Sequence, residues 1–209
     1  MMHFIDFHTH HSPEQQDVVA VVDGRDTWGI HPWRTDEFFS AAGEGAALLR
    51  PKGSLSEVLA IGECGLDALR GGAMERQEEL FRQHVGLSEE ARKPLVVHCV
   101  RALDRLLRLH RELRPQMPWM LHGFRGKPQQ LRSLLDAGLY VSFGFRHNVG
   151  SLRLCPIEKL LLETDDDALH PIREIYNNVA CARGIHIDEL CATMAENYRT
   201  FFQKEPQQA

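Results

Sequence analysis

From about residue 55 onward, short apolar runs alternate regularly with longer amphipathic segments, and this alternation restricts the fold more than any other feature. The runs are almost continuously apolar, as Leu95–Val97 and Leu160–Leu162 show. Such runs are typical of strands that are buried on both faces of a parallel sheet. The segments between them place apolar residues at helical spacing, and strands that alternate with such helices indicate βαβ units.

The alternation gives a specific series of expected elements. The predicted strands are residues 59–63, 95–98, 119–122, 139–143 and 159–163. The predicted helices are residues 75–91, 102–113, a helix that begins at Pro128 and is capped by Gly138, and residues near 172–182 and 187–202.

The N-terminal part departs from this rhythm. Apolar strands are expected at 4–7 and 18–22, and a third begins near Trp28, but the connections 11–17 and 23–27 are too short for crossover helices. We therefore expect the second strand to pair antiparallel with a neighbour, as a hairpin through residues 23–26. A complete (β/α)₈ barrel takes about 250 residues and rarely fewer than about 200, whereas this chain has 209. The predicted fold class is α/β, a TIM-like (β/α) barrel that is abbreviated or distorted in its N-terminal part, where helices are missing.

The net charge, the cysteines and the hydropathy pattern of the chain restrict the kinds of partner and environment that we expect for it. The formal net charge of −5 argues against a protein that holds duplex nucleic acid by bulk electrostatics. The five cysteines contain no C-x-x-C pair, which favours a reduced, cytoplasmic protein over a disulfide scaffold or a zinc finger. No run of about 18 apolar residues and no secretory leader are present, so we expect no membrane contact. Nothing in the sequence implies an obligate protein partner.

Histidines and carboxylates follow the ends of the predicted strands. They are His8, His10, Glu63, His98, His122 and Asp165. In a parallel α/β barrel, the carboxyl ends of all strands point to one face, so these side chains are expected to converge there. His8 and His10 are two residues apart on a strand and therefore share a face.

This donor set is too large for a single tetrahedral zinc with an open position. Four imidazoles and two carboxylates suit two divalent ions that share a carboxylate and a water, as in sites that activate an attacking water. The ions are expected to be Mg²⁺, Mn²⁺ or Zn²⁺, since sites of this composition accept several metals.

Six short motifs, each at the end of a predicted strand or in a turn, occur in a characteristic order. They are Phe4–His10 (FIDFHTH), Gly29–Trp33 (GIHPW), Ala60–Asp67 (AIGECGLD), Pro94–His98 (PLVVH), Leu121–Gly126 (LHGFRG) and Leu161–Asp165 (LLETD). Together they resemble the TatD family of metal-dependent deoxyribonucleases, within the amidohydrolase-like barrels. The resemblance runs from residue 4 to about residue 202.

The resemblance implies roles for the candidate residues. By analogy, His8, His10, Glu63 and Asp165 would hold one metal, and Glu63, His98 and His122 the other. Glu63 would bridge the two ions, and Asp165 would orient the nucleophilic water and take its proton. Asp165 and Glu63 are therefore the expected catalytic residues, and Asp6 is expected to orient or cap rather than to ligate.

The residues expected to contact substrate depart from the pattern of the family. An arginine that the family has two residues after His98 is replaced by Val100, with Arg101 next to it, and Asp166 and Asp167 follow Asp165 where the family has a small residue and a proline. The expected substrate-binding residues are Arg101, Arg125 and His31. His31 could line the pocket or pack its own turn. Arg146 is a further candidate for phosphate contact.

The function implied is that of a metal-dependent hydrolase, a TatD-like deoxyribonuclease that cleaves phosphodiester bonds at single-stranded DNA ends by two-metal water activation. Residues 1–203 would form a single hydrolase barrel domain and 204–209 a short C-terminal tail. One alternative keeps the metals but hydrolyses a small-molecule or aminoacyl ester or amide. A lesser alternative is a non-catalytic metal-binding scaffold.

Overall fold

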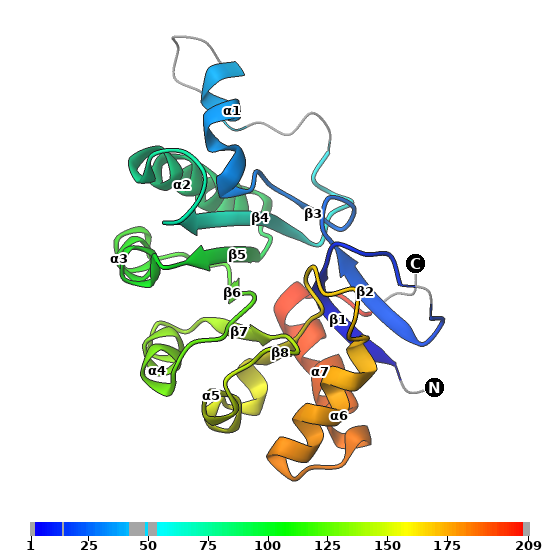
Figure 1. Ribbon diagram of the computed structural model, residues 1–209. Coiled ribbons are helices and arrows are strands. Elements are labelled where there is room, and N and C mark those ends of the chain that lie inside the picture. The colour runs from blue at the N-terminus through cyan, green and yellow to red at the C-terminus, as the bar shows by residue number, and fades with distance from the viewer. Residues whose placement is uncertain (1–2, 14, 42–48, 50–53, 207–209) are drawn as a thin grey trace. The chain divides into compact units, whose positions relative to one another are not determined.

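The computed structural model describes residues 3–13, 15–41, 49 and 54–206. The chain divides into two compact units. The terminal unit comprises Met1–Asp23 and Met120–Ala209, and the central unit comprises Gly24–Trp119. Each unit contains its own parallel strand pairs, and Figure 1 labels their elements.

The central unit contains a parallel sheet in the order β3-β4-β5. Its elements are β3 (Thr27–Trp28), the 3₁₀ turn Pro32–Arg34, α1 (Thr35–Ala41), β4 (Ala60–Asp67), α2 (Met74–Ala91), β5 (Leu95–Val100) and α3 (Leu103–Leu113). Thr27 pairs with Ala60, and Ile61 pairs with Leu95. Helix α2 packs against β4 and buries Leu80.

The terminal unit carries the remaining strands and the larger share of the helices. Its elements are β1 (Phe4–Thr9), β2 (Val18–Val22), β6 (Trp119–Leu121, whose first residue belongs to the central unit), α4 (Pro128–Asp136), β7 (Tyr140–Phe143), α5 (Val149–Leu154), the 3₁₀ turn Ile157–Lys159, β8 (Leu160–Leu162), α6 (Ile172–Arg183) and α7 (Ile187–Phe202). Strands β6, β7 and β8 are parallel neighbours, and β1 pairs with β2.

Helices α6 and α7 lie beside β1 and β8 (Figure 1). The Tyr176 hydroxyl in α6 accepts a hydrogen bond from the Ile5 N–H and donates one to the Ile5 carbonyl, both at 3.0 Å. Phe7 in β1 stacks on Phe202 in α7 with a centroid separation of 6.1 Å. These contacts fix β1, the strand that ends in the first two candidate ligands.

The predicted alternation of strands and helices is confirmed. Helices α2, α3, α4, α6 and α7 begin and end within a few residues of the predicted bounds. The short helices α1 and α5 were not predicted, because neither is long enough to show an apolar period. The predicted absence of helices is confirmed for the first connection, since none occurs over the described residues 11–13 and 15–17.

The predicted hairpin through residues 23–26 is wrong. Strand β2 pairs parallel with β1, with Phe4 opposite Val18 and Thr9 opposite Val22, and β3 pairs parallel with β4. For β2 to run parallel to β1, the connection from Thr9 to Val18 must lead back along the length of β1, which is about 17–20 Å. The residues between these strands can span up to about 28 Å when extended, so a crossover without a helix suffices.

The five cysteines are free, and three of them, Cys64, Cys155 and Cys191, are buried. Nowhere in the described ranges is a helix both long and apolar enough to cross a bilayer.

Candidate metal centre

Four of the predicted ligands lie together in the terminal unit. His8 is the fifth residue of β1 and is fully buried, and His10 follows the end of the same strand. His122 comes directly after β6, and Asp165 follows β8 by three residues. These positions are the carboxyl ends of parallel strands, where active-site residues are expected in an α/β barrel.

The donor atoms of this group, which we call the terminal cluster (His8, His10, His122, Asp165), surround one carboxylate oxygen. Oδ1 of Asp165 lies 3.7 Å from His8 Nε2, 3.6 Å from His10 Nε2 and 4.0 Å from His122 Nδ1. One donor atom each from His8, His122 and Asp165 falls within 4.8 Å of the others. Three donors at this separation can contact a common divalent ion without large movement.

Asp165 is held in an unusual backbone conformation. Its φ angle is +58°, in the left-handed region that few residues other than glycine adopt. Two backbone hydrogen bonds fasten it to the end of β1, from the Asp165 N–H to the His8 carbonyl and from the His10 N–H to the Asp165 carbonyl, both at 3.0 Å. The bridge between Thr9 and Asp165 therefore fixes three cluster members relative to one another.

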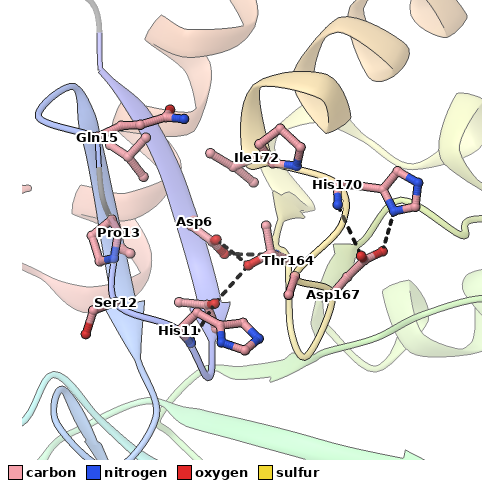
Figure 2. A pocket seen from close by; sticks show the side chains of 14 residues that line it. Asp6, His11, Ser12, Pro13, Gln15, Thr164, Asp167, His170 and Ile172 are labelled. Carbon is pink, nitrogen blue, oxygen red and sulfur yellow. Dashed lines mark hydrogen bonds and ion pairs between the residues drawn. The ribbon is translucent and has the colours of Figure 1, made fainter.

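A buried hydrogen-bond chain lies directly beneath this bridge. The Thr164 N–H and hydroxyl donate to the two oxygens of Asp6 at 3.0 and 2.6 Å, and the Thr164 and Thr9 hydroxyls are 2.8 Å apart. Figure 2 shows Asp6 and Thr164 facing one another. Burial raises the pKa of Asp6 to about 7, although the two hydrogen bonds from Thr164 oppose this shift. Asp6 thus orients the loop that carries Asp165, in agreement with the sequence expectation.

Two carboxylates outside the predicted set lie near the cluster histidines. Asp23 Oδ2 is 3.8 Å from His10 Nδ1, the ring nitrogen opposite the one that faces Asp165. A carboxylate in this position orients a metal-binding histidine and increases its basicity. Oε1 of the fully buried Glu163 is 3.8 Å from His122 Nδ1, the same nitrogen that faces Asp165, and this carboxylate accepts a hydrogen bond from the Gly123 N–H.

Asp167, in the acidic segment after Asp165, is hydrogen-bonded within its own loop. Asp167 accepts a hydrogen bond from the Leu169 N–H at 3.0 Å. It also accepts hydrogen bonds from the His170 N–H at 3.2 Å and from His170 Nδ1 at 2.8 Å, as Figure 2 shows. Burial works against ionisation of Asp167, but these hydrogen bonds outweigh it and lower its pKa. Its charge is therefore paired and does not simply add to the repulsion of a polyanion.

The other predicted ligands lie in the central unit, in what we call the central cluster (His31, Glu63, His98). Oε1 of the buried Glu63 is 2.8 Å from His98 Nδ1 and 3.1 Å from His31 Nε2. The three donors again lie within 4.8 Å of one another. His31, expected to contact substrate or to pack its turn, therefore also has the position of a possible ligand. Its Nδ1 accepts a hydrogen bond from the Trp33 N–H at 3.2 Å, so both expected roles are structurally possible.

Asp67 orients the second nitrogen of His98. Its Oδ2 lies 3.3 Å from His98 Nε2 and accepts a 2.6 Å hydrogen bond from Trp33 Nε1, while its Oδ1 accepts from the Leu69 and Arg70 N–H groups. Burial opposes ionisation of Asp67, but the hydrogen bonds from Trp33, Leu69 and His98 outweigh it, so its pKa is lowered. Apart from its position at the end of the Gly65-Leu66-Asp67 segment, Asp67 carries no signal in the sequence that predicts this role.

Glycine and a buried histidine shape the central cluster. At Gly65, a Cβ atom would stand 2.0 Å from the His98 carbonyl oxygen, so only glycine permits β4 and β5 to approach here. His84 in α2 is fully buried and accepts a 2.9 Å hydrogen bond from the Ile30 N–H, next to the turn that carries His31.

The predicted substrate-binding arginines are both exposed. Arg125 lines a cavity that also includes Asp165, in the terminal unit. Arg101 follows β5 in the central unit and has a φ angle of +49°.

The two clusters have the donor chemistry of divalent-metal sites. Imidazole and carboxylate ligands suit Zn²⁺ and Mn²⁺, and carboxylates and water suit Mg²⁺. Each cluster combines a carboxylate with at least two imidazoles, and each has a further carboxylate behind a histidine, Asp23 behind His10 and Asp67 behind His98. The residues present therefore fit bound divalent ions in both units.

Comparison with protein families gives a consistent result. The family of TatD-related DNases matches residues 6–203. The chain is 33% identical over 205 residues to a 3′-5′ ssDNA/RNA exonuclease TatD of Erwinia tasmaniensis, covering 84% of this chain and 77% of that protein. It is 28% identical over 195 residues to the uncharacterized metal-dependent hydrolase YcfH of Escherichia coli, covering 83% and 72%.

A solved structure shows the same fold. The hydrolase TatD family protein from Entamoeba histolytica matches with a TM-score of 0.72 and 21% identity, over 88% of this chain and 74% of that chain. This likeness confirms the predicted fold class, an α/β fold of the TIM-like barrel type.

Proposed function

Since this chain belongs to the family of TatD-related DNases, we propose that it is a metal-dependent hydrolase that cleaves phosphodiester bonds at the ends of single-stranded DNA. The observation that carries the proposal is the pair of donor clusters, each with a carboxylate within 4.8 Å of two imidazoles. The same activity could extend to RNA, because relatives with 33% identity are named for both nucleic acids.

The proposed ligands are the six predicted residues, four in the terminal cluster and Glu63 and His98 in the central cluster. His31 is added as a candidate ligand because of its distance from Glu63. We propose two divalent ions in all, Mg²⁺, Mn²⁺ or Zn²⁺. When bound, such ions lower the pKa of a water molecule and offset the charge of the phosphoryl oxygens.

The protein side chains would perform the proton transfer and the positioning. Asp165 would accept a proton from the attacking water at its carboxylate, and its fixed backbone would hold that carboxylate in one orientation. Asp6 and Thr164 would preserve this geometry during turnover, and Asp23 would help to orient the His10 ring. Glu63 is the second proposed catalytic residue.

Arg125, Arg101 and His31 are the proposed substrate contacts. An exposed guanidinium binds a phosphate through two parallel hydrogen bonds, which makes arginine suited to a phosphodiester backbone. The net charge of −5 is no obstacle to binding at an end, since two divalent cations would bring it to about −1 and place positive charge at the scissile group. We further propose residues 1–203 as one hydrolase domain, with a cytoplasmic location supported by five free cysteines.

The test is an assay on labelled single-stranded DNA with Mg²⁺, Mn²⁺ or Zn²⁺, with Asp165→Asn as the control. Stepwise shortening by the wild-type protein, absent in Asp165→Asn, would support the nuclease. RNA of the same sequence tests the second nucleic acid. Hydrolysis of small esters or amides without any shortening of DNA would replace the proposal with the alternative that the substitution of Val100 for an arginine favours.

A further inference from the structure

A cavity of about 340 Å³ opens beside Asp165 in the terminal unit. It is formed by the loops that follow β6, β7 and β8, and its lining includes Arg125, Phe145, Arg146 and Asp166. Its volume is at the lower end of the range of about 300–1,000 Å³ that small-molecule sites occupy. A space of this size suits a single nucleotide unit rather than a duplex.

The two arginines at this cavity are available to a ligand. Both side chains belong to exposed residues, and neither guanidinium has a hydrogen-bond or ion-pair partner within the part of the chain that the structure describes. By contrast, Arg105 and Arg108 in the central unit are engaged by Glu78 at 2.8 and 2.7 Å. Arginines that are left without an acidic partner beside a cavity favour an anionic ligand.

Phe145 is held rigidly at the same cavity. Its ring stacks on the His170 ring with a centroid separation of 3.5 Å and an interplanar angle of 10°. His170 is fixed in turn by the 2.8 Å hydrogen bond to Asp167. One face of Phe145 is therefore covered by His170, and the half-buried ring borders the cavity with the remainder of its surface. A preorganised aromatic ring is the usual platform on which an unpaired base stacks.

The carboxylates of the cavity do not oppose this interpretation. Asp167 is paired with His170, and Glu163 is fully buried and accepts a hydrogen bond from the Gly123 N–H. Asp165 is a proposed metal ligand, so its charge would be offset by the ion. Asp166 is the single exposed carboxylate that remains in the lining against two exposed arginines.

We propose that this cavity binds one nucleotide next to the scissile phosphate, with Arg125 and Arg146 contacting phosphates and Phe145 stacking on the base. The inference rests on the proposed nuclease function, because it places the nucleotide-binding site beside Asp165. It assigns a binding role to Phe145 and Arg146 and predicts that the chain prefers an oligonucleotide to a small phosphodiester. Stacking is tolerant of base identity, so we expect little sequence preference.

The test is direct binding of a fluorescent, phosphorothioate-linked single-stranded oligothymidylate, which resists hydrolysis, in buffer with Mg²⁺. Arg125→Ala and Arg146→Ala should each weaken binding about tenfold and lower the slope of log K against log salt by about one. Phe145→Leu should weaken binding about tenfold or more without changing that slope. The matched control is Arg132→Ala, which removes the same charge from an exposed position on α4.

Each result decides the inference. Equal binding by wild type and the three cavity variants, or an equal loss in Arg132→Ala, would overturn it, as would failure of the wild-type protein to bind the oligonucleotide. A parallel assay compares unmodified DNA with bis(p-nitrophenyl) phosphate, for which the cavity variants should lose several-fold less activity than for DNA. If the wild-type protein binds the oligonucleotide through the cavity but cleaves no DNA, the proposed function is wrong while the nucleotide-binding site is supported.

Discussion

At the scale of single residues, the conformation of Asp165 depends on neighbours that never touch substrate. Its left-handed backbone is stabilised by the bridge to β1 and by the chain that runs from Asp6 through Thr164 to Thr9. A general base must be held within hydrogen-bond reach of the proton that it removes, so a shift of this loop lowers turnover more than it lowers affinity.

We therefore expect Thr164→Val to lower kcat by about tenfold or more, with KM within about twofold of wild type. The substitution keeps the shape of the side chain but leaves Asp6 Oδ2 without its 2.6 Å hydrogen bond. The conservative variant Thr164→Ser keeps the hydroxyl and should restore most of the turnover. Steady-state kinetics on DNA are the measurement, and a wild-type kcat in Thr164→Val would contradict the positioning role.

His84 provides a second residue-scale prediction, on stability against pH. Burial lowers its pKa to about 4 from an ordinary value of 6.5, although a hydrogen bond with the Leu80 carbonyl opposes the shift. The unfolded chain therefore binds more protons than the folded one between pH 6.5 and 4, and the free energy of unfolding falls as pH falls through this window. Above pH 6.5 the contribution of His84 is constant.

Replacing His84 by Gln should flatten this dependence by about 2–3 kcal/mol between pH 6.5 and 4. The variant should also be less stable at pH 7.5 by about 1–3 kcal/mol, because the Ile30 N–H loses a well-placed acceptor. Urea unfolding of the metal-free proteins at several pH values measures both effects. Parallel pH profiles for the two proteins would show that His84 does not control the slope.

At this scale the positions of the ligands could be predicted from the sequence, but the residues that support them could not. The six predicted ligands end strands, and strand ends can be located from apolar runs, so their positions in the fold could be predicted without knowledge of packing, whereas their division between two clusters could not. Asp23 and Asp67 lie behind histidines. Their roles depend on side chains from distant segments meeting, which spacing does not encode.

At the scale of elements, the close approach of β4 and β5 positions Glu63 and His98. Gly65 has a φ angle of +147°, and any side chain there would collide with the His98 backbone. We expect Gly65→Ala to lower the free energy of unfolding by about 2 kcal/mol or more, since it combines backbone strain with a steric clash.

Gly86 in α2 offers a matched control for that substitution. It lies in an exposed helical position where a Cβ atom would meet nothing within 4 Å. Gly86→Ala should therefore raise the free energy of unfolding by about 0.5–1 kcal/mol, because alanine is the better helix former. Urea denaturation compares the pair, and equal effects of the two substitutions would argue against the close approach as the cause.

The elements that were predicted correctly are long helices, in which the apolar period repeats many times, and strands with a continuous apolar run. Helices α2 and α7 span 18 and 16 residues, which gives an apolar stripe many turns to appear. Strand pairing was harder. The parallel return of β2 depends on whether a short chain can cover the length of β1, and this is a matter of three-dimensional reach rather than of residue type.

At the scale of the whole molecule, bound metal should contribute to stability, because the donor clusters exist only in the folded chain. A ligand present at about 1,000 times its Kd stabilises the folded state by about 4 kcal/mol. For a chain of 209 residues, this corresponds to a rise in Tm of roughly 8–16 °C. Chelation by EDTA should remove that increment, and readdition of Mn²⁺ or Zn²⁺ should restore it.

Substitution of one donor in each cluster separates the contributions of the two clusters to the metal-induced rise in Tm. His10→Asn removes a donor of the terminal cluster, and His98→Asn removes one of the central cluster. If each cluster helps to hold an ion, each variant should bind about one metal equivalent fewer than wild type and show a smaller metal-induced rise in Tm. Metal content by mass spectrometry and Tm by calorimetry provide the two readouts, with the metal-free Tm of each variant as the control for folding. A full metal complement in His98→Asn, with a wild-type rise in Tm, would show that His98 holds no ion and would contradict the proposed metal site in the central cluster.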